Sequence, residues 1–168
     1  MVTHECNVKC HYCFNCAEGT QISLEDSKKA IDLLVKHKPP MATELSITFF
    51  GGEPLLGYEL IKNVKAYCRS AYPNIKWIYD LTTNFSIMNQ TIYEEVILDP
   101  NFYVLISLDG REQDNIHRVF RNSGEPTYGT VLHNIKNIML NPMFNQEARD
   151  PTRARLDHWH GKETKEKF

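Results

Sequence analysis

Residues 3 to 13 read Thr3-His4-Glu5-Cys6-Asn7-Val8-Lys9-Cys10-His11-Tyr12-Cys13 and place three thiols on one short segment at the spacing C-x3-C-x2-C. A cubane iron–sulfur cluster takes four cysteine ligands in the usual case. Three ligands from the protein leave one iron with an open coordination position, by the same logic that keeps a position free on a catalytic zinc. Because an open iron can bind a substrate directly, the spacing indicates a chemical use and not only a structural one.

Spacing alone leaves other uses of the cysteines open. The early cysteines could bind zinc, with a nearby histidine as a further ligand. The candidates for such a zinc site are Cys6, Cys10, Cys13, Cys16, His4 and His11. Cys10, Cys13 and Cys16 also have the ferredoxin-like spacing C-x2-C-x2-C. Cys68 stands alone in a predicted helix, so we expect it to be a small buried hydrophobic residue.

Strand patterns and helix patterns alternate downstream of the cysteines. Ser23 caps a helical pattern that Pro39-Pro40 ends. The expected strands are residues 45–50, 75–81 and 102–108, and the expected helices are residues 24–37, 60–71, 90–98 and 128–140. The last strand is nearly all apolar, which suits burial on both faces. Since strand centres recur at the roughly thirty-residue spacing of a βαβ unit, the pattern predicts an α/β fold with a parallel sheet and helices packed outside it.

Polar residues gather where the predicted strands end. They are Gly51-Gly52-Glu53-Pro54, Thr83-Asn84 and Ser107-Leu108-Asp109-Gly110, and the cysteine segment follows a short first strand expected at Val2-Thr3. The carboxyl ends of parallel strands meet on one face, where active sites of such folds lie. Four segments are therefore expected to meet at the carboxyl-end face of the sheet. Glycines allow close approach of the backbone and positive φ, and proline fixes the exit from the turn.

The composition changes after Asn141-Pro142. Residues 142–168 are mostly polar and charged, so we expect residues 1–141 to form one domain and the remainder to be a disordered tail. A complete (β/α)8 barrel uses about 250 residues. The sequence therefore predicts a partial parallel (β/α) barrel that is truncated after about four βα units.

These motifs together resemble the radical S-adenosylmethionine (SAM) superfamily. The resemblance rests on the three-cysteine spacing with Tyr12 before its last cysteine, on the motifs at the strand ends, and on the stretch from Arg118 to Gly124. It covers residues 1–141 and is nearest to the N-terminal core of SPASM-type, anaerobic sulfatase maturase-like enzymes that modify peptides or proteins. It implies a radical SAM core with a [4Fe-4S] cluster held by Cys6, Cys10 and Cys13.

The resemblance also implies the remaining site residues. The SAM-binding residues would be Tyr12, Gly51, Gly52, Glu53, Pro54, Asn84, Ser107, Asp109 and Arg118. In the resembled family the Gly-Gly-Glu-Pro motif holds the amino group of SAM. An arginine meets the SAM carboxylate, a role for which Arg118 is the first candidate and Arg121 the alternative. The implied function is cleavage of SAM to a 5′-deoxyadenosyl radical that abstracts hydrogen from a peptide or protein side chain.

Partners and location follow from composition and from the resemblance. The net charge of −2 and the scattered basic residues argue against nucleic acid. No apolar run reaches the roughly 18 residues that span a membrane, and no signal peptide precedes the cysteines, so a cytoplasmic enzyme is expected. The family implies an external electron donor of the flavodoxin or ferredoxin type. The competing hypothesis is a truncated, non-catalytic fragment that binds an iron–sulfur cluster or zinc.

Overall fold

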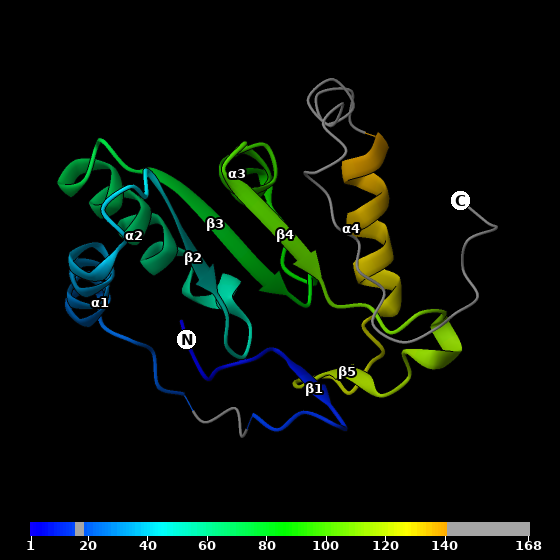
Figure 1. The fold of residues 1–168 in the computed structure, drawn as a ribbon. Coiled ribbons are helices and arrows are strands. Elements are labelled where there is room, and N and C mark those ends of the chain that lie inside the picture. The colour runs from blue at the N-terminus through cyan, green and yellow to red at the C-terminus, as the bar shows by residue number, and fades with distance from the viewer. Residues whose placement is uncertain (16–18, 141–168) are drawn as a thin grey trace.

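The computed structural model of the chain describes residues 1–15 and 19–140, and Figure 1 shows their arrangement. At its centre lies a parallel sheet of three strands in the order β2-β3-β4. The strands are β2 (Glu44–Phe49), β3 (Lys76–Thr83) and β4 (Phe102–Ile106). Ile47 pairs with Tyr79, and Leu81 pairs with Val104. The α/β fold and the parallel strands are therefore as the sequence predicts.

In the part of the chain that the structure describes, four α-helices accompany the sheet. They are α1 (Leu24–His37), α2 (Tyr58–Ala71), α3 (Gln90–Ile92) and α4 (Tyr128–Leu140). Three further short helical segments are η1 (Pro54–Gly57), η2 (Tyr93–Ile97) and η3 (Glu112–Asp114). The first and last are 3-10 helices, and η2 is a π-helix that continues α3. The side chain of Ser23 accepts from Asp26 N at 3.0 Å and so caps α1. The predicted helix 90–98 thus forms in two pieces, and helix 60–71 begins two residues earlier than expected.

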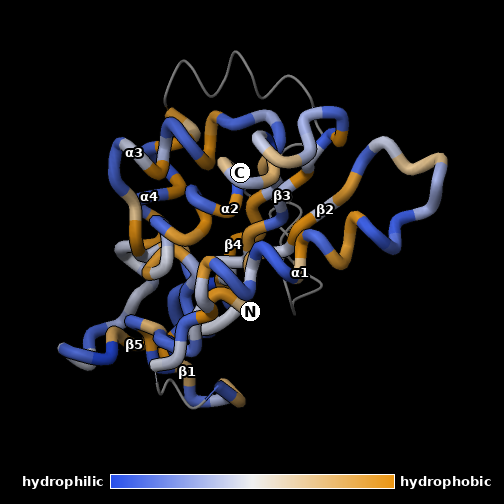
Figure 2. The backbone as a smooth tube through the Cα atoms, turned by 90° about the vertical axis from the view of Figure 1, so that its left-hand side faces the viewer, coloured by the Kyte–Doolittle hydropathy of each residue, from blue (hydrophilic) through white to orange (hydrophobic). Residues whose placement is uncertain are grey.

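The core consists of two clusters of buried side chains. The larger one joins α1, α2, β3 and the segment after α3, and its fully buried members include Ile61, Cys68, Tyr79 and Leu81. Burial of Cys68 agrees with the sequence prediction. The smaller cluster packs Phe85 and Tyr93 against α4. Figure 2 shows apolar residues along the strands of the sheet and apolar residues alternating with polar ones along the helices.

A second, antiparallel pair of strands was not expected from the sequence. Strand β1 (Val8–Cys10) lies inside the cysteine segment and pairs with β5 (Arg118–Phe120), with Cys10 opposite Arg118. We call this pair the β1–β5 ribbon. The first strand expected at Val2-Thr3 is not formed, because Thr3 makes only an isolated bridge with Gln21. The prediction of that strand was wrong, since the backbone of residues 3–5 bonds to the Gly51–Pro54 turn instead.

Strand β4 also differs from its prediction. It ends at Ile106 rather than at residue 108, and its residues Tyr103–Ile106 are only half-buried. The reason is that β4 is the edge strand of the described sheet, with β3 as its one neighbour there. The described strands form an open sheet, so the partial barrel stays a prediction. The predicted tail at residues 142–168 lies outside the described residues.

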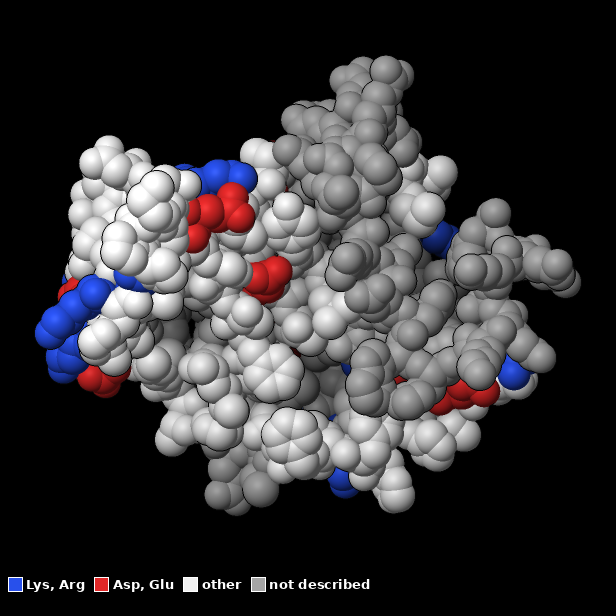
Figure 3. Space-filling model, viewed as in Figure 1, with Lys and Arg blue, Asp and Glu red and all other residues white. Residues whose placement is uncertain are grey.

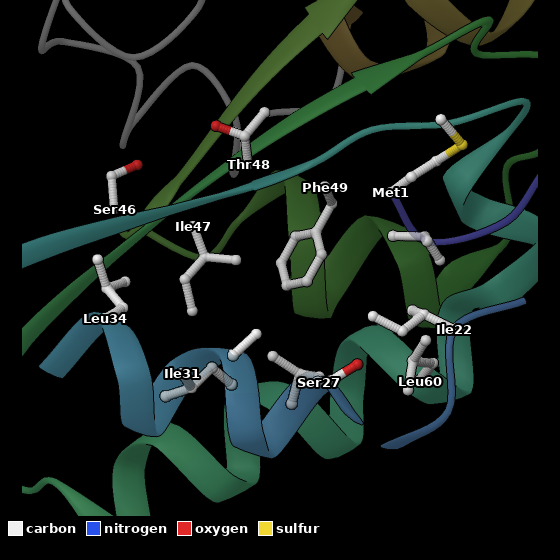
Figure 4. A pocket seen from close by; sticks show the side chains of 13 residues that line it. Met1, Ile22, Ser27, Ile31, Leu34, Ser46, Ile47, Thr48, Phe49 and Leu60 are labelled. Carbon is white, nitrogen blue, oxygen red and sulfur yellow. The ribbon is translucent and has the colours of Figure 1, made fainter. Parts of the chain in front are cut away.

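An apolar hollow of about 220 Å³ lies between α1 and β2. Figure 4 shows Ile31 and Leu34 of α1 facing Ile47 and Phe49 of β2 across it. None of the predicted site residues lines it, so it is separate from the site described below. On the face seen in Figure 3, acidic and basic side chains occur in small separate groups. Within residues 1–15 and 19–140, none of the helices has the length and apolar character needed to cross a bilayer.

Candidate metal and cofactor site

The cysteine loop, residues 3–15, is anchored on the turn that follows β2. Gly52 N donates to the carbonyl of Thr3, and Glu53 N donates to the carbonyl of Glu5, each at 2.8 Å. A Cβ at Gly52 would lie 2.1 Å from the Glu5 oxygen, and one at Gly51 would lie 2.3 Å from the Thr3 oxygen. Both positions therefore require glycine. The backbone that approaches them in this structure is that of the cysteine loop. Pro54 is buried and opens η1, which fits its fixed φ.

The three predicted cluster ligands are free thiols on this loop. Cys6 and Cys10 are half-buried, whereas Cys13 is exposed. Burial raises the pKa of both half-buried thiols; Arg118 opposes the rise at Cys10, and Val8 N–H and Asn84 oppose it at Cys6. In the described part of the chain, no three Cys, His, Asp or Glu side chains converge as ligands of one metal ion. Cysteine thiolates are the usual ligands of iron–sulfur clusters, so the chemistry of this donor set, three thiols on one loop, fits a cluster. Cys16 lies outside the described residues.

Glu53 joins the end of β2 to the end of β3. Its carboxylate is fully buried; Oε1 accepts from Thr83 Oγ1 at 2.7 Å and from Leu55 N at 3.0 Å, and Oε2 accepts from Asn84 N at 2.7 Å. Burial raises the pKa of Glu53, while these three hydrogen bonds oppose the rise. Each carboxylate oxygen can accept two hydrogen bonds. Oε2 thus accepts one described hydrogen bond, and the role of Glu53 toward SAM stays a prediction.

Asn84 connects the end of β3 to the first cysteine. Its amide nitrogen Nδ2 donates to Asn7 Oδ1 at 3.0 Å and lies 3.7 Å from Cys6 Sγ. Its oxygen Oδ1 accepts from the backbone N and the hydroxyl of Ser86. The sequence places Asn84 at a strand end near a cofactor, and the structure puts it beside a predicted cluster ligand.

Tyr12, Asp109 and Arg118 form a second connection across the site. The Tyr12 hydroxyl donates to Asp109, and Arg118 Nη1 donates to Tyr12 at 3.0 Å and to Asp109 at 3.4 Å. Burial, followed by the bond to Asp109, raises the pKa of Tyr12 to about 12. Burial lowers the pKa of Arg118, but the negative charges that Cys10, Tyr12 and Asp109 carry when ionised, together with the hydrogen bond to Tyr12, raise it more. Three of the predicted site residues therefore meet around one buried guanidinium.

Two further residues that the sequence proposes for SAM binding, Arg121 and Ser107, lie beside the hydrogen-bond networks of Asn84 and Arg118. Arg121 is exposed and donates through Nε to the Cys6 carbonyl at 3.1 Å, so it supports the loop from outside. Ser107 is half-buried, and its backbone N donates to the Thr83 carbonyl at 2.9 Å. The structure thus brings the candidate residues of four segments together, as the sequence predicts. Their contacts with a cofactor stay predictions.

Sequence reasoning missed three residues of the site. Asn7 and Ser86 hydrogen-bond to Asn84 and to each other, and no motif marks Ser86. Phe85 has a φ of 58°, a left-handed conformation that bulky residues rarely adopt. Thr83 Oγ1 accepts from its N–H, and Asn134 of α4 donates to its carbonyl, each at 2.9 Å. The turn at the end of β3 is therefore held in a strained shape beside the cysteine loop.

Comparison with protein families gives one match over most of the chain. The family described as a 4Fe-4S single cluster domain matches residues 1–125. These residues contain the three thiols, the Gly51–Pro54 turn, Asn84, Ser107, Asp109 and Arg118. The match therefore spans every segment of the site.

Two curated relatives cover most of the chain. An uncharacterised protein of Methanocaldococcus jannaschii is 34% identical over 145 residues, which are 86% of this chain and 48% of the relative. The radical SAM cyclopropyl synthase TigE of Paramaledivibacter caminithermalis is 25% identical over 159 residues, which are 84% of this chain and 32% of that enzyme. The chain therefore spans less than half the length of either relative.

Solved structures show the same fold. Native anSMEcpe with bound AdoMet and Kp18Cys peptide superposes with a TM-score of 0.71 at 23% identity, over 87% of this chain and 39% of the solved chain. Native anSMEcpe with bound AdoMet gives a TM-score of 0.70 at 22% identity, again over 87% of this chain and 39% of the other. The family match and the relative TigE, together with this shared fold, confirm the resemblance to radical SAM enzymes. The expected [4Fe-4S] cluster agrees with the description of the matching family, and the expected SAM agrees with the AdoMet (SAM) bound in the anSMEcpe structures. The match to residues 1–125, together with the thiols gathered on one anchored loop, shows that the chain belongs to the 4Fe-4S single cluster domain family.

Proposed function

We propose that this chain is the cofactor-binding part of a radical SAM enzyme that acts on a peptide or protein side chain. Cys6, Cys10 and Cys13 hold a [4Fe-4S] cluster, and SAM binds beside it. When bound, these cofactors supply the 5′-deoxyadenosyl radical that abstracts hydrogen from the substrate. The observation that carries the proposal is the anchoring of the cysteine loop on the ends of β2 and β3 and on β5.

The chain's own residues position and enclose the cofactors. The Gly51–Pro54 turn fixes the backbone of the loop through Thr3 and Glu5. Arg118, which is 6% exposed, places a positive charge near Cys10, where a guanidinium can bind the carboxylate of SAM. The carboxylate of Glu53, which is fully buried, would be the partner of the ammonium group of SAM. Together these groups would present opposite charges to the two ends of an amino acid moiety.

The wider activity is proposed from the relatives. The anSMEcpe structure holds a peptide with AdoMet, which supports a peptide partner for this chain. The proposal includes a partial (β/α) barrel formed by residues 1–141 and an external electron donor of the flavodoxin or ferredoxin type. The free thiols of Cys6, Cys10 and Cys13 favour a reducing compartment such as the cytoplasm. The proposed activity involves neither nucleic acid nor a membrane.

Anaerobic reconstitution of the full chain with iron and sulfide tests the proposal. We expect about four irons and four sulfides per chain and an electron paramagnetic resonance (EPR) signal of the reduced protein that changes when SAM is added. Each of the variants Cys6→Ser, Cys10→Ser and Cys13→Ser should abolish the cluster. Cys16→Ser is the matched control and should retain it. Bound zinc in place of iron would contradict the assignment and support the zinc-binding alternative. Equal loss of the cluster in the Cys16 variant would also contradict it, because Cys16 would then be a cluster ligand as well.

A further inference from the structure

We propose that Asn84 tunes the reduction potential of the cluster by donating an amide N–H to the sulfur of Cys6. This inference rests on the proposed function, because it needs a cluster bound to Cys6. Asn84 Nδ2 lies 3.7 Å from Cys6 Sγ, and the Asn84 residue is only 7% exposed. Its role differs from direct contact with SAM, because its partner is a ligand atom of the cluster.

The hydrogen-bond pattern fixes which end of the Asn84 amide faces the sulfur. The backbone N–H of Ser86 can only donate, and it lies 2.9 Å from Asn84 Oδ1. The atom that faces it must therefore be the oxygen. The NH2 group is then left on the side of Asn7 and Cys6, where its two protons have two acceptors, Asn7 Oδ1 at 3.0 Å and Cys6 Sγ.

A closed ring of hydrogen bonds holds the donor in place. Asn84 donates to Asn7, Asn7 Nδ2 donates to Ser86 Oγ at 2.8 Å, and Ser86 Oγ donates back to Asn84 Oδ1 at 2.7 Å. Asn7 follows Cys6 directly in sequence, so the ring ties the donor to the residue that carries the thiol. The backbone of Asn84 is fixed separately, through its bond to the buried Glu53 carboxylate.

Such a donor acts on the two oxidation states unequally. Reduction adds one electron from an external one-electron donor to the cluster, and no covalent bond is formed or broken. The added charge is shared with the thiolate sulfurs, so an N–H donor stabilises the reduced state more than the oxidised state. Hydrogen bonds to sulfur are one of the factors that set iron–sulfur potentials. The Asn84 amide should therefore make the cluster easier to reduce.

The test is a redox titration of the reconstituted full chain, followed by EPR. Asn84→Ala removes the N–H donor and leaves the backbone bond to Glu53. We expect its midpoint potential to be more negative than that of the wild type at unchanged iron and sulfide content. Ser86→Ala breaks the ring but keeps Nδ2, so we expect a smaller shift in the same direction. Asn89→Ala is the matched control, because Asn89 caps α3 through Ile92 N, and its potential should not change.

The outcomes separate this inference from the proposed function. A wild-type chain that takes up no iron and sulfide contradicts the function. A wild-type cluster whose midpoint is unchanged in Asn84→Ala overturns the role of Asn84 and leaves the function standing. If Asn84→Ala holds no cluster, Ser86→Ala decides. In that case a midpoint equal to the wild type overturns the inference, and a more negative one supports it.

Discussion

The backbone of Gly52 lies so close to Glu5 that a Cβ at position 52 would fall 2.1 Å from the Glu5 carbonyl oxygen. The same oxygen accepts a hydrogen bond from Glu53 N at 2.8 Å. The loop that carries the three thiols is therefore seated on the turn after β2 by its main chain. A side chain at position 52 would force these two backbone segments apart.

Gly52→Ala should destabilise the fold and reduce cluster uptake. Overpacking against backbone cannot be relieved by a rotamer change, so we expect a loss of about 3 kcal/mol in the free energy of unfolding, the upper end for such changes. Urea denaturation and the iron content after reconstitution measure the two effects. Gly129→Ala is the matched control, because nothing lies within 4 Å of the added Cβ in α4. It should be neutral or stabilising by up to about 1 kcal/mol.

Arg118 and Arg121 should differ in their effect on SAM binding. Arg118 is buried beside Cys10 and Asp109. Arg121 is exposed, and its described hydrogen bonds go to the main-chain carbonyls of Cys6 and Asn7. Arg118→Lys removes the planar fork of donors and should weaken SAM binding about tenfold, which is roughly 1.4 kcal/mol. Arg121→Lys should leave it nearly unchanged. Titration of the EPR change with SAM measures both, and the opposite order would assign the carboxylate to Arg121.

The parallel sheet and its helices could be predicted because their signals are local. Apolar residues recur at regular spacing in the strand at residues 75–81 and in the helix capped by Ser23. Each element is followed by residues that end it, Thr83-Asn84 after the strand and Pro39-Pro40 after the helix. Strand ends of a parallel sheet meet by topology, so Asn84 and Asp109 could be placed at one mouth without coordinates. The burial of β4 could not be predicted, because the sequence does not show that β4 is an edge strand here.

The parts that could not be predicted depend on contacts between distant segments. Strands β1 and β5 are three residues long. This is too short for the alternation of apolar and polar residues that marks a strand in a sequence. Ser86 becomes a site residue only because the left-handed Phe85 turns the chain toward Asn7. The spacing C-x3-C-x2-C, read together with the family resemblance, predicts which thiols would bind one cluster. It does not show which asparagine approaches one of them.

Tyr12→Phe and Asp109→Asn should have unequal effects on stability, although both break the connection to Arg118. Loss of the Tyr12 hydroxyl leaves Arg118 facing Asp109 at 3.4 Å, so we expect a cost of about 1 kcal/mol for one hydrogen bond. Loss of the Asp109 charge leaves a guanidinium that is 7% exposed without its carboxylate, which should cost about 3 kcal/mol. Urea denaturation of the apo proteins measures both. Equal costs would show that Asp109 does not compensate the charge of Arg118.

Glu53→Gln should change how stability depends on pH. Burial raises the pKa of Glu53 above its ordinary value of 4.5, so folding favours the protonated form. The stabilisation from this group is then fully present below pH 4.5 and is lost as the pH rises through the pKa in the folded state. Glutamine does not titrate. In the glutamine variant, the side-chain NH2 group would point at a hydrogen-bond donor, which is either Asn84 N or the pair of Leu55 N and Thr83 Oγ1. Two donors facing each other should lower the free energy of unfolding by about 1–3 kcal/mol.

The difference in unfolding free energy between wild type and Glu53→Gln should therefore be largest in acid and shrink as the pH rises. Urea denaturation of the apo proteins between about pH 4 and pH 8 measures this difference, in which the titration of all other groups cancels. Glu59→Gln is the matched control, since Glu59 is exposed on α2, and its difference should stay small at every pH. A Glu53→Gln difference that does not vary with pH would mean that Glu53 has an ordinary pKa in the folded chain. The three hydrogen bonds to its carboxylate would then offset the cost of its burial completely.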